Sequence, residues 1–471
     1  MNPNTKIKFG TDGWRDTYQE NFNEKNIKLC IIGLIKHILN QSMESKPVVV
    51  GYDSRYKSKE FAEIVVSTLN EHNIQTFSFD SFAPTPACSI AVKHYQASYG
   101  VMITASHNSK EWNGIKIKYK NGGSAPEKDI EKIEKNIYSG INIQKSYDIS
   151  SNLDTKFDVH SLYIKKIFEN FDIDSVNGRL KIVVDYMHGS GSNLVKKILK
   201  NTSHEVIEIR ESFDPEFPNM VQPEPIEKNL MPLIDSVKEN NADIGIAFDG
   251  DADRLGIIDE KGNYISTLNV FSILSDHMLQ YEKNSTSIVC NITMSSMVEK
   301  IGEKYNCEII RTPVGFKNIA PIIEKKKSIL GGEESGGYAF RNHIPERDGI
   351  LSALYFLQSM IKNNKTPGNL LDRLHKEFGY KIYHRIDKEI HPEVYEDIKK
   401  NITSLRPEYI GKFKVLSINT LDGIKFFIDD DSWVAIRISG TEPLLRIYIE
   451  TIDFSNIKQI SESIMKYIEI K

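Results

Sequence analysis

Pro47-Val-Val-Val-Gly51 is a short apolar run, followed by the polar turn Tyr52-Asp53-Ser54-Arg55 and a helical pattern from Lys59 to Glu71. A short, continuous apolar run indicates a strand that is buried on both faces. A polar turn and a helix after such a strand are typical of the units from which parallel sheets are built. We therefore predict that this segment lies in an α/β domain.

The same order of elements occurs twice more along the chain. Leu180 to Asp185 precedes the turn His188 to Gly191 and a helical pattern from Asn193 to Leu199. Further on, a strand pattern from Ser287 to Asn291 precedes a helical pattern from Met294 to Tyr305. Three such units predict three related α/β domains rather than one large sheet.

Two polar segments and the C-terminal pattern give the expected domain limits. Asn121 to Tyr147 combines Gly, Ser and Pro with a charged helix and is predicted to close the first domain. Lys362 to Gly368 contains a Pro-Gly pair and is predicted to be a linker. Alternating strands at Phe413 to Ile418 and Trp433 to Ile438, followed by a terminal helix, predict a small α+β domain. We expect domains at residues 1–150, 151–256, 257–368 and 369–471.

Composition excludes several classes of protein. The 471 residues suffice for three or four domains, at roughly 150 residues each. The 60 Lys and Arg nearly balance the 64 Asp and Glu, which argues against a nucleic-acid or membrane partner. The four scattered cysteines form no CxxC pair, so neither a zinc site nor a disulfide framework is predicted. Because the polar N-terminus lacks a signal-peptide core and no apolar stretch could span a bilayer, we expect a cytoplasmic protein. The sequence leaves the oligomeric state open.

Three acids at alternate positions are the sharpest sign of chemistry. The run Phe248-Asp-Gly-Asp-Ala-Asp-Arg254 contains Asp249, Asp251 and Asp253. In an extended chain these carboxylates face one way, and they repel one another unless a cation neutralises them. Oxygen ligands of this kind suit Mg²⁺. A calcium-binding EF-hand loop fits less well, although Glu260 stands at position 12, because position 6 holds Arg254 instead of Gly. The alternative is a polar hairpin without a metal.

Two further loops carry polar groups beyond predicted strands. Val101 to Asn108 runs from a buried strand into Ser106, which is where α/β sheets place ligands, although a turn residue is the simpler alternative. The loop lacks the G-x-S-x-G elbow of hydrolases, and Lys116 follows ten residues later. Leu330 to Gly337 is rich in glycine and carries two acids, so it suits neutral sugar hydroxyls better than phosphate, unless it is simply an acidic turn.

A basic turn near the C-terminus fits an anion. Arg437-Ile-Ser-Gly-Thr-Glu-Pro443 lies between two predicted strands, and Arg446 follows three residues later. Two arginines, two hydroxyls and an unhindered glycine amide can clamp a phosphate group. A solvated hairpin turn is the alternative.

Taken in this order, the motifs resemble those of the α-D-phosphohexomutase family, which comprises phosphoglucomutases and phosphomannomutases. The matching stretches are Phe9-Gly-Thr-Asp-Gly-Trp-Arg15, Thr104-Ala-Ser-His-Asn108, Asp249-Gly-Asp-Ala-Asp-Arg254, Gly332-Glu-Glu-Ser-Gly336 and Arg437 to Pro443. The resemblance covers nearly the whole chain. It implies four domains around a central cleft, three of them related α/β domains and the last an α+β domain.

The resemblance also assigns roles to single residues. It implies that Ser106 is a phosphoserine that gives and takes the phosphoryl group, and that Ser106 joins the three aspartates in holding Mg²⁺. It places Lys116, Arg15 and His107 beside the transferred group, with Lys116 a candidate for proton transfer. The substrate-binding residues that it implies are Arg254, Thr312, Gly315, Glu333, Ser335, His343, Arg347, Arg437, Ser439, Gly440, Thr441 and Arg446.

The activity implied by the resemblance is phosphoglucomutase, which interconverts glucose 1-phosphate and glucose 6-phosphate through a hexose 1,6-bisphosphate. Thr312 to Lys317 and His343 to Gly349 look more like phosphoglucomutases than like phosphoglucosamine mutases. In dual-specificity phosphomannomutases the sugar loop typically ends in Ser-Gly-His, whereas this chain has Gly337 at the position of the histidine. His343 or Arg347 would then take over the role of that histidine. The alternatives are a phosphomannomutase or dual-specificity enzyme, a sugar phosphatase, and a sugar-phosphate binder without catalysis.

Overall fold

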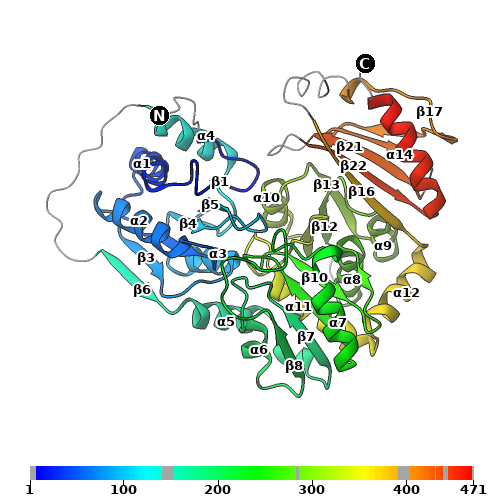
Figure 1. Ribbon diagram of the computed structural model, residues 1–471, viewed down its shortest axis with the longest axis horizontal. Helices are drawn as coiled ribbons and strands as arrows, with labels where there is room; N and C mark the ends of the chain where they lie inside the picture. The colour runs from blue at the N-terminus through cyan, green and yellow to red at the C-terminus, as the bar shows by residue number, and fades with distance from the viewer. Residues whose placement is uncertain are drawn as a thin grey trace.

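The structure, a computed structural model, describes residues 7–139, 153–282, 286–390, 398, 402–429, 431–438 and 444–468. These residues form four sheets of four to six strands and one two-stranded sheet (Figure 1). The first three sheets are mixed and the fourth is antiparallel throughout. The prediction of three related α/β domains followed by an α+β domain is confirmed.

The first domain has a six-stranded sheet in the order β1-β5-β4-β2-β3-β6. Its strands are β1 (Trp14–Thr17), β2 (Val48–Tyr52), β3 (Thr76–Phe79), β4 (Tyr99–Ile103), β5 (Trp112–Tyr119) and β6 (Asp154–Phe157). Its helices are α1 (Glu24–Asn40), α2 (Ser58–Asn70), α3 (Thr85–His94) and α4 (Glu127–Ile137). Strand β2 is the apolar run from which the fold was predicted, and it is buried along its whole length.

The second domain has a five-stranded sheet in the order β11-β10-β9-β7-β8. Its strands are β7 (Lys181–Asp185), β8 (Glu205–Ile209), β9 (Ile244–Phe248), β10 (Leu255–Ile258) and β11 (Tyr264–Ile265). Its helical segments are α5 (Val159–Asn170), η1 (Ile173–Val176), α6 (Leu194–Leu199), η2 (Glu227–Asn229) and α7 (Met231–Asn240).

The third domain has a four-stranded sheet in the order β13-β12-β14-β15. Its strands are β12 (Ser287–Asn291), β13 (Glu308–Thr312), β14 (Leu330–Gly332) and β15 (Tyr338–Phe340). Its helices are α8 (Thr267–Gln280), α9 (Met297–Tyr305), α10 (Phe316–Lys326), α11 (Gly349–Asn363) and α12 (Pro367–Phe378).

The fourth domain has a five-stranded sheet in the order β16-β22-β21-β20-β19, against which a C-terminal helix packs. Its strands are β16 (Ile382–Glu389), β19 (Ser417–Asn419), β20 (Ile424–Phe427), β21 (Trp433–Ile438) and β22 (Leu444–Thr451), with a separate pair β17 (Tyr409–Ile410) and β18 (Phe413–Lys414), and the helix is α14 (Phe454–Ile468). The single strand predicted at Phe413 to Ile418 was wrong, because β18 and β19 pair with different partners.

One connection pattern repeats in the first three domains and positions the candidate site. In each, a central strand pairs in parallel with the next strand and with a later one: β2 with β3 and β4, β7 with β8 and β9, and β12 with β13 and β14. The later strand then turns back into an antiparallel partner, β5, β10 or β15. The three turns β4–β5, β9–β10 and β14–β15 therefore follow the carboxyl ends of equivalent strands, where α/β sheets bind ligands.

The sheets extend slightly beyond the predicted domain limits. Strand β6 pairs with β3 and so continues the first sheet to Phe157, past residue 150. Strands β10 and β11 continue the second sheet to Ile265, past residue 256. The predicted linker Lys362 to Gly368 was wrong, because its ends belong to α11 and α12. Thr366 accepts a hydrogen bond from Asn369 N and Pro367 stands in the first turn of α12, so the segment starts a helix.

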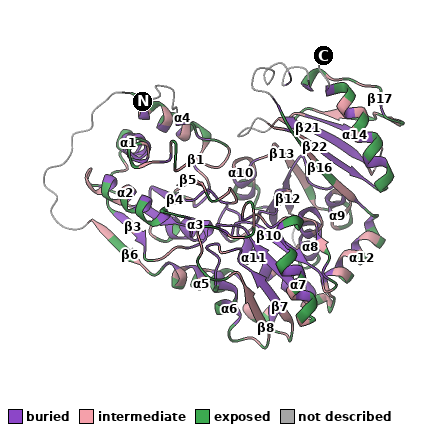
Figure 2. Ribbon diagram, viewed as in Figure 1, coloured by how far each residue is buried: buried purple, intermediate pink, exposed green. Residues whose placement is uncertain are grey.

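The central strands β2, β9, β12 and β21 are buried almost along their whole length and form the cores, whereas edge strands such as β16 are largely exposed (Figure 2). One continuous apolar cluster runs through the first three domains, and the fourth domain has a cluster of its own. All four cysteines are free, and Cys30, Cys88 and Cys290 are buried. In the part of the chain that the structure describes, no helix combines the length and the apolar character needed to span a membrane.

The fourth domain is attached to the third by buried polar contacts. Glu450 accepts hydrogen bonds from Ser296 N at 2.8 Å and from Trp433 Nε1 at 2.8 Å. Lys425 donates to the carbonyl oxygen of Ile292 at 2.8 Å, and its Nζ lies 3.6 Å from the centre of the Trp433 ring. Since an unpaired buried charge is costly, these contacts fix where the two domains meet.

Candidate active site

The turn after β4 holds Ser106 in a constrained conformation. Ser106 has a positive φ of 54°, and its amide donates to Thr104 Oγ1 at 2.8 Å. Its hydroxyl donates to Asp249 Oδ2 at 3.0 Å, which joins the first domain to the second. Arg55 fixes the turn from the end of β2, because its Nη2 donates to the carbonyl oxygens of Ser106 and Asn108, both at 2.5 Å. A serine with this backbone conformation is held by its surroundings, as is common at functional sites.

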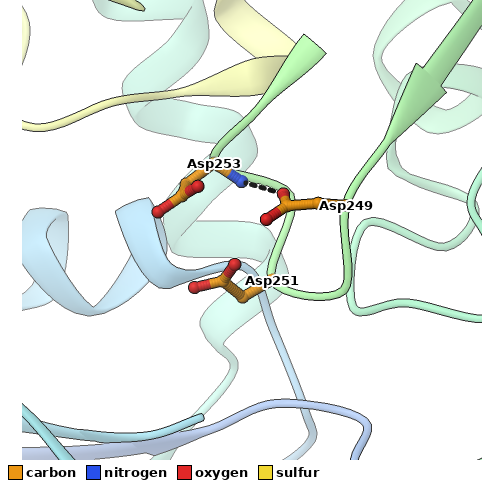
Figure 3. A group of neighbouring side chains, drawn as sticks. All are labelled: Asp249, Asp251 and Asp253. Carbon is orange, nitrogen blue, oxygen red and sulfur yellow. Dashed lines mark hydrogen bonds between the residues drawn. The ribbon is translucent and has the colours of Figure 1, made fainter. Parts of the chain in front are cut away.

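The turn between β9 and β10 carries the three aspartates, as Figure 3 shows. All three are fully buried, and one carboxylate oxygen from each lies within 4.8 Å of the others. The turn is closed by Asp253 N, which donates to Asp249 Oδ1 at 3.0 Å. Burial, together with the charges of Asp251 and Asp253, raises the pKa of Asp249 well above its ordinary value.

Lys116 of β5 brings positive charge to this acidic turn. Its Nζ lies 2.8 Å from Asp251 Oδ2, 3.2 Å from Asp253 Oδ2 and 2.9 Å from Asp12 Oδ2. Burial alone would lower the pKa of Lys116, but the three carboxylates outweigh it and raise the pKa above its ordinary value. The same contact with Lys116 helps to hold the pKa of Asp12 well below its ordinary value against the effect of burial.

Arg347 brings a second cation from the third domain. Its Nη2 lies 2.6 Å from Asp12 Oδ2 and 2.8 Å from Asp253 Oδ2, and its Nη1 lies 3.5 Å from Glu333 Oε2. The guanidinium also lies 5.5 Å from the centre of the Phe316 ring. Arg347 therefore contacts acids of three domains.

The acidic turn fits a hard divalent cation. Asp251 Oδ1 and Asp253 Oδ1 are buried, and neither has a hydrogen-bond partner among the described residues. Asp251 Oδ2 is already engaged, since it accepts from Thr85 Oγ1 at 2.5 Å and from Lys116 at 2.8 Å. Buried carboxylate oxygens are rarely left unpaired, and Mg²⁺ prefers such oxygen ligands. The unpaired oxygens are thus the natural ligand atoms of this cluster.

The turn between β14 and β15 presents Glu333 beside Arg347. Gly315 N donates to Glu333 Oε1 at 2.8 Å, which leaves the second oxygen toward Arg347 at 3.5 Å. Burial raises the pKa of Glu333 to about 7, although the Arg347 charge opposes the shift. Ser335 is half-buried on the same turn. Thr312 ends β13, and its hydroxyl donates to the carbonyl oxygen of Pro313 at 2.9 Å.

The other predicted residues of the reacting centre lie around Ser106. Arg15 Nη1 donates to Asn108 Oδ1 at 2.7 Å, on the same turn as Ser106. Burial and the charges of Arg254 and Arg15 hold the pKa of His107 well below its ordinary value, so its imidazole is neutral near pH 7. Arg254 Nη1 lies 2.9 Å from Glu224 Oε1, and its Nε lies 4.0 Å from Asp249 Oδ2.

The basic turn of the fourth domain is described only in part. Ser439, Gly440 and Thr441 lie outside the described residues. Arg437 and Arg446 face each other directly across β21 and β22. Like charges at such a position repel, so the pair favours a bound anion. Asp422 orients Arg437, whose Nε donates to it at 2.8 Å, and also accepts from Val314 N of the third domain at 2.8 Å.

His343 takes part in a different contact network. Its Nε2 lies 3.0 Å from Asp348 Oδ2, and its Nδ1 lies 3.2 Å from Asn170 Nδ2. Asp348 also accepts from Tyr163 Oη at 2.7 Å and caps α11. Both ring nitrogens thus join α5 to α11, which does not favour the substrate-binding role implied for His343.

Sequence reasoning did not single out several residues that the structure brings to the site. Asp12 stands inside the quoted Phe9 to Arg15 motif, and Arg55 stands in the polar turn after β2. Their position after a predicted strand or inside a motif could have marked them. Thr85 and Asp422 act through contacts between domains, and Glu224 acts through a contact with Arg254 within the second domain. No local pattern distinguishes these three residues.

Comparison with protein families agrees with this arrangement of domains and loops. The phosphoglucomutase/phosphomannomutase models match all four domains: α/β/α domain I at residues 6–143, domain II at 161–262, domain III at 268–378 and the C-terminal domain at 388–466. The fold and site therefore define a phosphohexomutase. The chain belongs to the phosphoglucomutase/phosphomannomutase family, whose members are isomerases.

Individual relatives carry names for more than one substrate. A phosphoglucomutase/phosphomannomutase of Thermococcus kodakarensis is 30% identical over 465 residues, which cover 98% of each chain. A phosphoglucosamine mutase of Prochlorococcus marinus strain MIT 9215 is 30% identical over 466 residues, with 97% of each chain covered. A Thermus thermophilus structure described as a candidate phosphomannomutase superposes with a TM-score of 0.86 at 26% identity, over 99% of this chain and 100% of that one.

We predict that replacing Asp253 with Asn abolishes stabilisation by Mg²⁺. In the unmodified chain, Mg²⁺ that binds the acidic turn should raise the thermal unfolding midpoint, because a ligand at about 100 times its Kd adds ~2.7 kcal/mol of stability. Differential scanning fluorimetry with and without MgCl₂ measures the shift. Asp235→Asn, at an exposed position on α7, is the matched control and should keep it. An equal shift in Asp253→Asn would contradict a metal site at this turn.

We predict that Glu333→Gln changes how stability depends on pH. With its pKa raised from 4.5 to about 7, folded Glu333 holds a proton that the unfolded chain has released, so stability falls as pH rises through this window. The loss approaches about 3 kcal/mol. The variant has no such proton, so its unfolding midpoint should rise relative to that of the unmodified chain as pH increases from roughly 5 to 8. Exposed Glu303→Gln is the control, and parallel curves for Glu333→Gln and the unmodified chain would refute the prediction.

Proposed function

We propose that the protein is a Mg²⁺-dependent phosphoglucomutase that interconverts glucose 1-phosphate and glucose 6-phosphate through a phosphoserine at Ser106. The observation that carries this proposal is the hydrogen bond from Ser106 Oγ to Asp249 Oδ2, at 3.0 Å, on a buried turn of three aspartates. Phosphoryl transfer depends mainly on positioning and on neutralising charge. The hydrogen bond to Asp249 positions the serine, and Lys116, together with a Mg²⁺ ion held by the aspartates, would neutralise the charge.

In the proposed reaction Ser106 carries the phosphoryl group and gives it to a hydroxyl of a bound hexose monophosphate. The Oγ–P bond breaks as the bond from the sugar oxygen to phosphorus forms. The sugar hydroxyl loses its proton, and Ser106 Oγ takes up a proton. Lys116 and Arg15 provide positive charge beside the transferred group, and Arg55 keeps the serine turn in place. Mg²⁺, held by Ser106 and the three aspartates, would neutralise charge on that group.

The second half of the proposed reaction returns the other phosphoryl group to Ser106. The hexose 1,6-bisphosphate must reverse its orientation within the site, so that either phosphate can occupy the phosphate-binding residues of the fourth domain. Arg437, Arg446 and the turn with Ser439, Gly440 and Thr441 are proposed to hold the phosphate that is not reacting, which converts binding energy into alignment. Glucose 1,6-bisphosphate would accordingly activate an enzyme whose serine is unphosphorylated.

Glucose is the proposed sugar, and mannose is the second candidate. The likeness of Thr312 to Lys317 and of His343 to Gly349 to phosphoglucomutases supports glucose. The Thermococcus kodakarensis relative is named for both glucose and mannose phosphates, which favours mannose as the alternative. Glu333 and Ser335 are proposed to bind sugar hydroxyls, together with Thr312 at the end of β13 and Gly315 of the connection between β13 and α10, where Gly315 N contacts Glu333. The cytoplasmic location stays a prediction.

Mutase assays with Mg²⁺ and a trace of glucose 1,6-bisphosphate test this proposal. Glucose 1-phosphate, mannose 1-phosphate and glucosamine 1-phosphate are compared, and we expect glucose 1-phosphate to have the highest kcat/KM. Ser106→Ala should lose activity by about four orders of magnitude or more, because it removes the group that carries the phosphoryl. Ser109→Ala, on the same turn, is the control.

The other outcomes separate the alternatives. Preference for mannose 1-phosphate or glucosamine 1-phosphate would contradict the choice of glucose and keep the phosphoserine. Release of inorganic phosphate without isomerisation would indicate a phosphatase. Turnover that survives Ser106→Ala would contradict the mechanism.

A further inference from the structure

Gly337, which ends the turn between β14 and β15, leaves space that Arg347 fills. A Cβ atom placed on Gly337 would lie 2.2 Å from Cδ, 2.9 Å from Cγ and 3.4 Å from Cβ of Arg347. Real Cβ contacts essentially never fall below 3.0 Å. Any side chain at this position would therefore displace the aliphatic part of Arg347.

Arg347 has little freedom to step aside, because it is fixed at both ends. Its guanidinium lies 2.6 Å from Asp12 Oδ2 and 2.8 Å from Asp253 Oδ2. At the backbone end, the amide of Asp348 donates to the carbonyl oxygen of Tyr338 at 2.9 Å, and Tyr338 directly follows Gly337. Moving the Arg347 chain away from Gly337 would break one of these attachments.

A buried ion pair anchors the residue before Arg347 to the first domain. Lys118 Nζ donates to Glu346 Oε2, and both side chains are fully buried. Lys118 stands two residues from Lys116 on β5, so alternate positions of this strand contact Glu346 and the acidic turn. The path of Arg347 is thus set by the same strand that carries Lys116.

We propose that Gly337 and Arg347 form a positioning pair, in which the missing side chain at Gly337 lets Arg347 hold Glu333 in register with Asp253 and Asp12. Arg347 is then a positioning residue that links the sugar loop to the acidic turn, in addition to any contact with substrate. The inference rests on the proposed function insofar as Glu333 binds the sugar.

A double-mutant cycle tests the pair. Gly337→Ala, Arg347→Ala and the double variant are compared with the unmodified chain by mutase kinetics and by thermal unfolding. Gly337→Ala should lower kcat/KM about ten-fold or more. In the Arg347→Ala background the added methyl has space, so the double variant should match Arg347→Ala in both kcat/KM and unfolding midpoint. Gly178→Ala, whose Cβ would come no nearer than 3.3 Å to its neighbours, is the matched control.

Two results would overturn the pair. One is a Gly337→Ala variant with kcat/KM and unfolding midpoint equal to those of the unmodified chain. The other is an equal loss from Gly337→Ala in both backgrounds, since independent effects add. The unfolding measurements need no substrate. Absence of mutase turnover in the unmodified chain would therefore contradict only the proposed function, and the coupling between the two substitutions in unfolding would still test the proposed pair.

Discussion

The structure depends on the need to neutralise three aspartates buried on one turn. Converging carboxylates are unstable away from water unless cations lie beside them. The turn of the second domain obtains those cations from its neighbours: Lys116 comes from the first domain and Arg347 from the third. Asp12 contacts both cations and completes the network. The charge balance of the candidate active site is therefore also what holds three domains in a fixed relation.

The repeated topology explains why these groups meet. Each of the first three sheets turns from a parallel strand into an antiparallel partner at the same place. The first turn carries Ser106, the second the aspartates and the third Glu333. One connection pattern, used three times, supplies three different chemical components, and the fourth domain adds two facing arginines. The candidate site is therefore built mainly from turns, and strands add Lys116 of β5 and the two arginines of β21 and β22.

Much of the fold and part of the site could be predicted from the sequence. The strand at Ser287 to Asn291 and the cluster of three aspartates follow from local patterns, since a run of apolar residues and closely spaced carboxylates can be recognised from neighbouring residues. The paths of Arg347 and Asp12 could not be predicted, because their partners lie on other domains and depend on how these pack. His343 illustrates the reverse case: a motif suggested a substrate contact, whereas packing between α5 and α11 occupies both ring nitrogens.

The most direct test of the account is to locate the phosphoryl group. The purified protein is incubated with Mg²⁺ and glucose 1,6-bisphosphate, and its peptides are mapped by mass spectrometry. We predict phosphate on Ser106, and loss of that phosphate when glucose 1-phosphate or glucose 6-phosphate is added in excess. Phosphate on another residue, or a Ser106 that stays unmodified while the enzyme turns over, would contradict it.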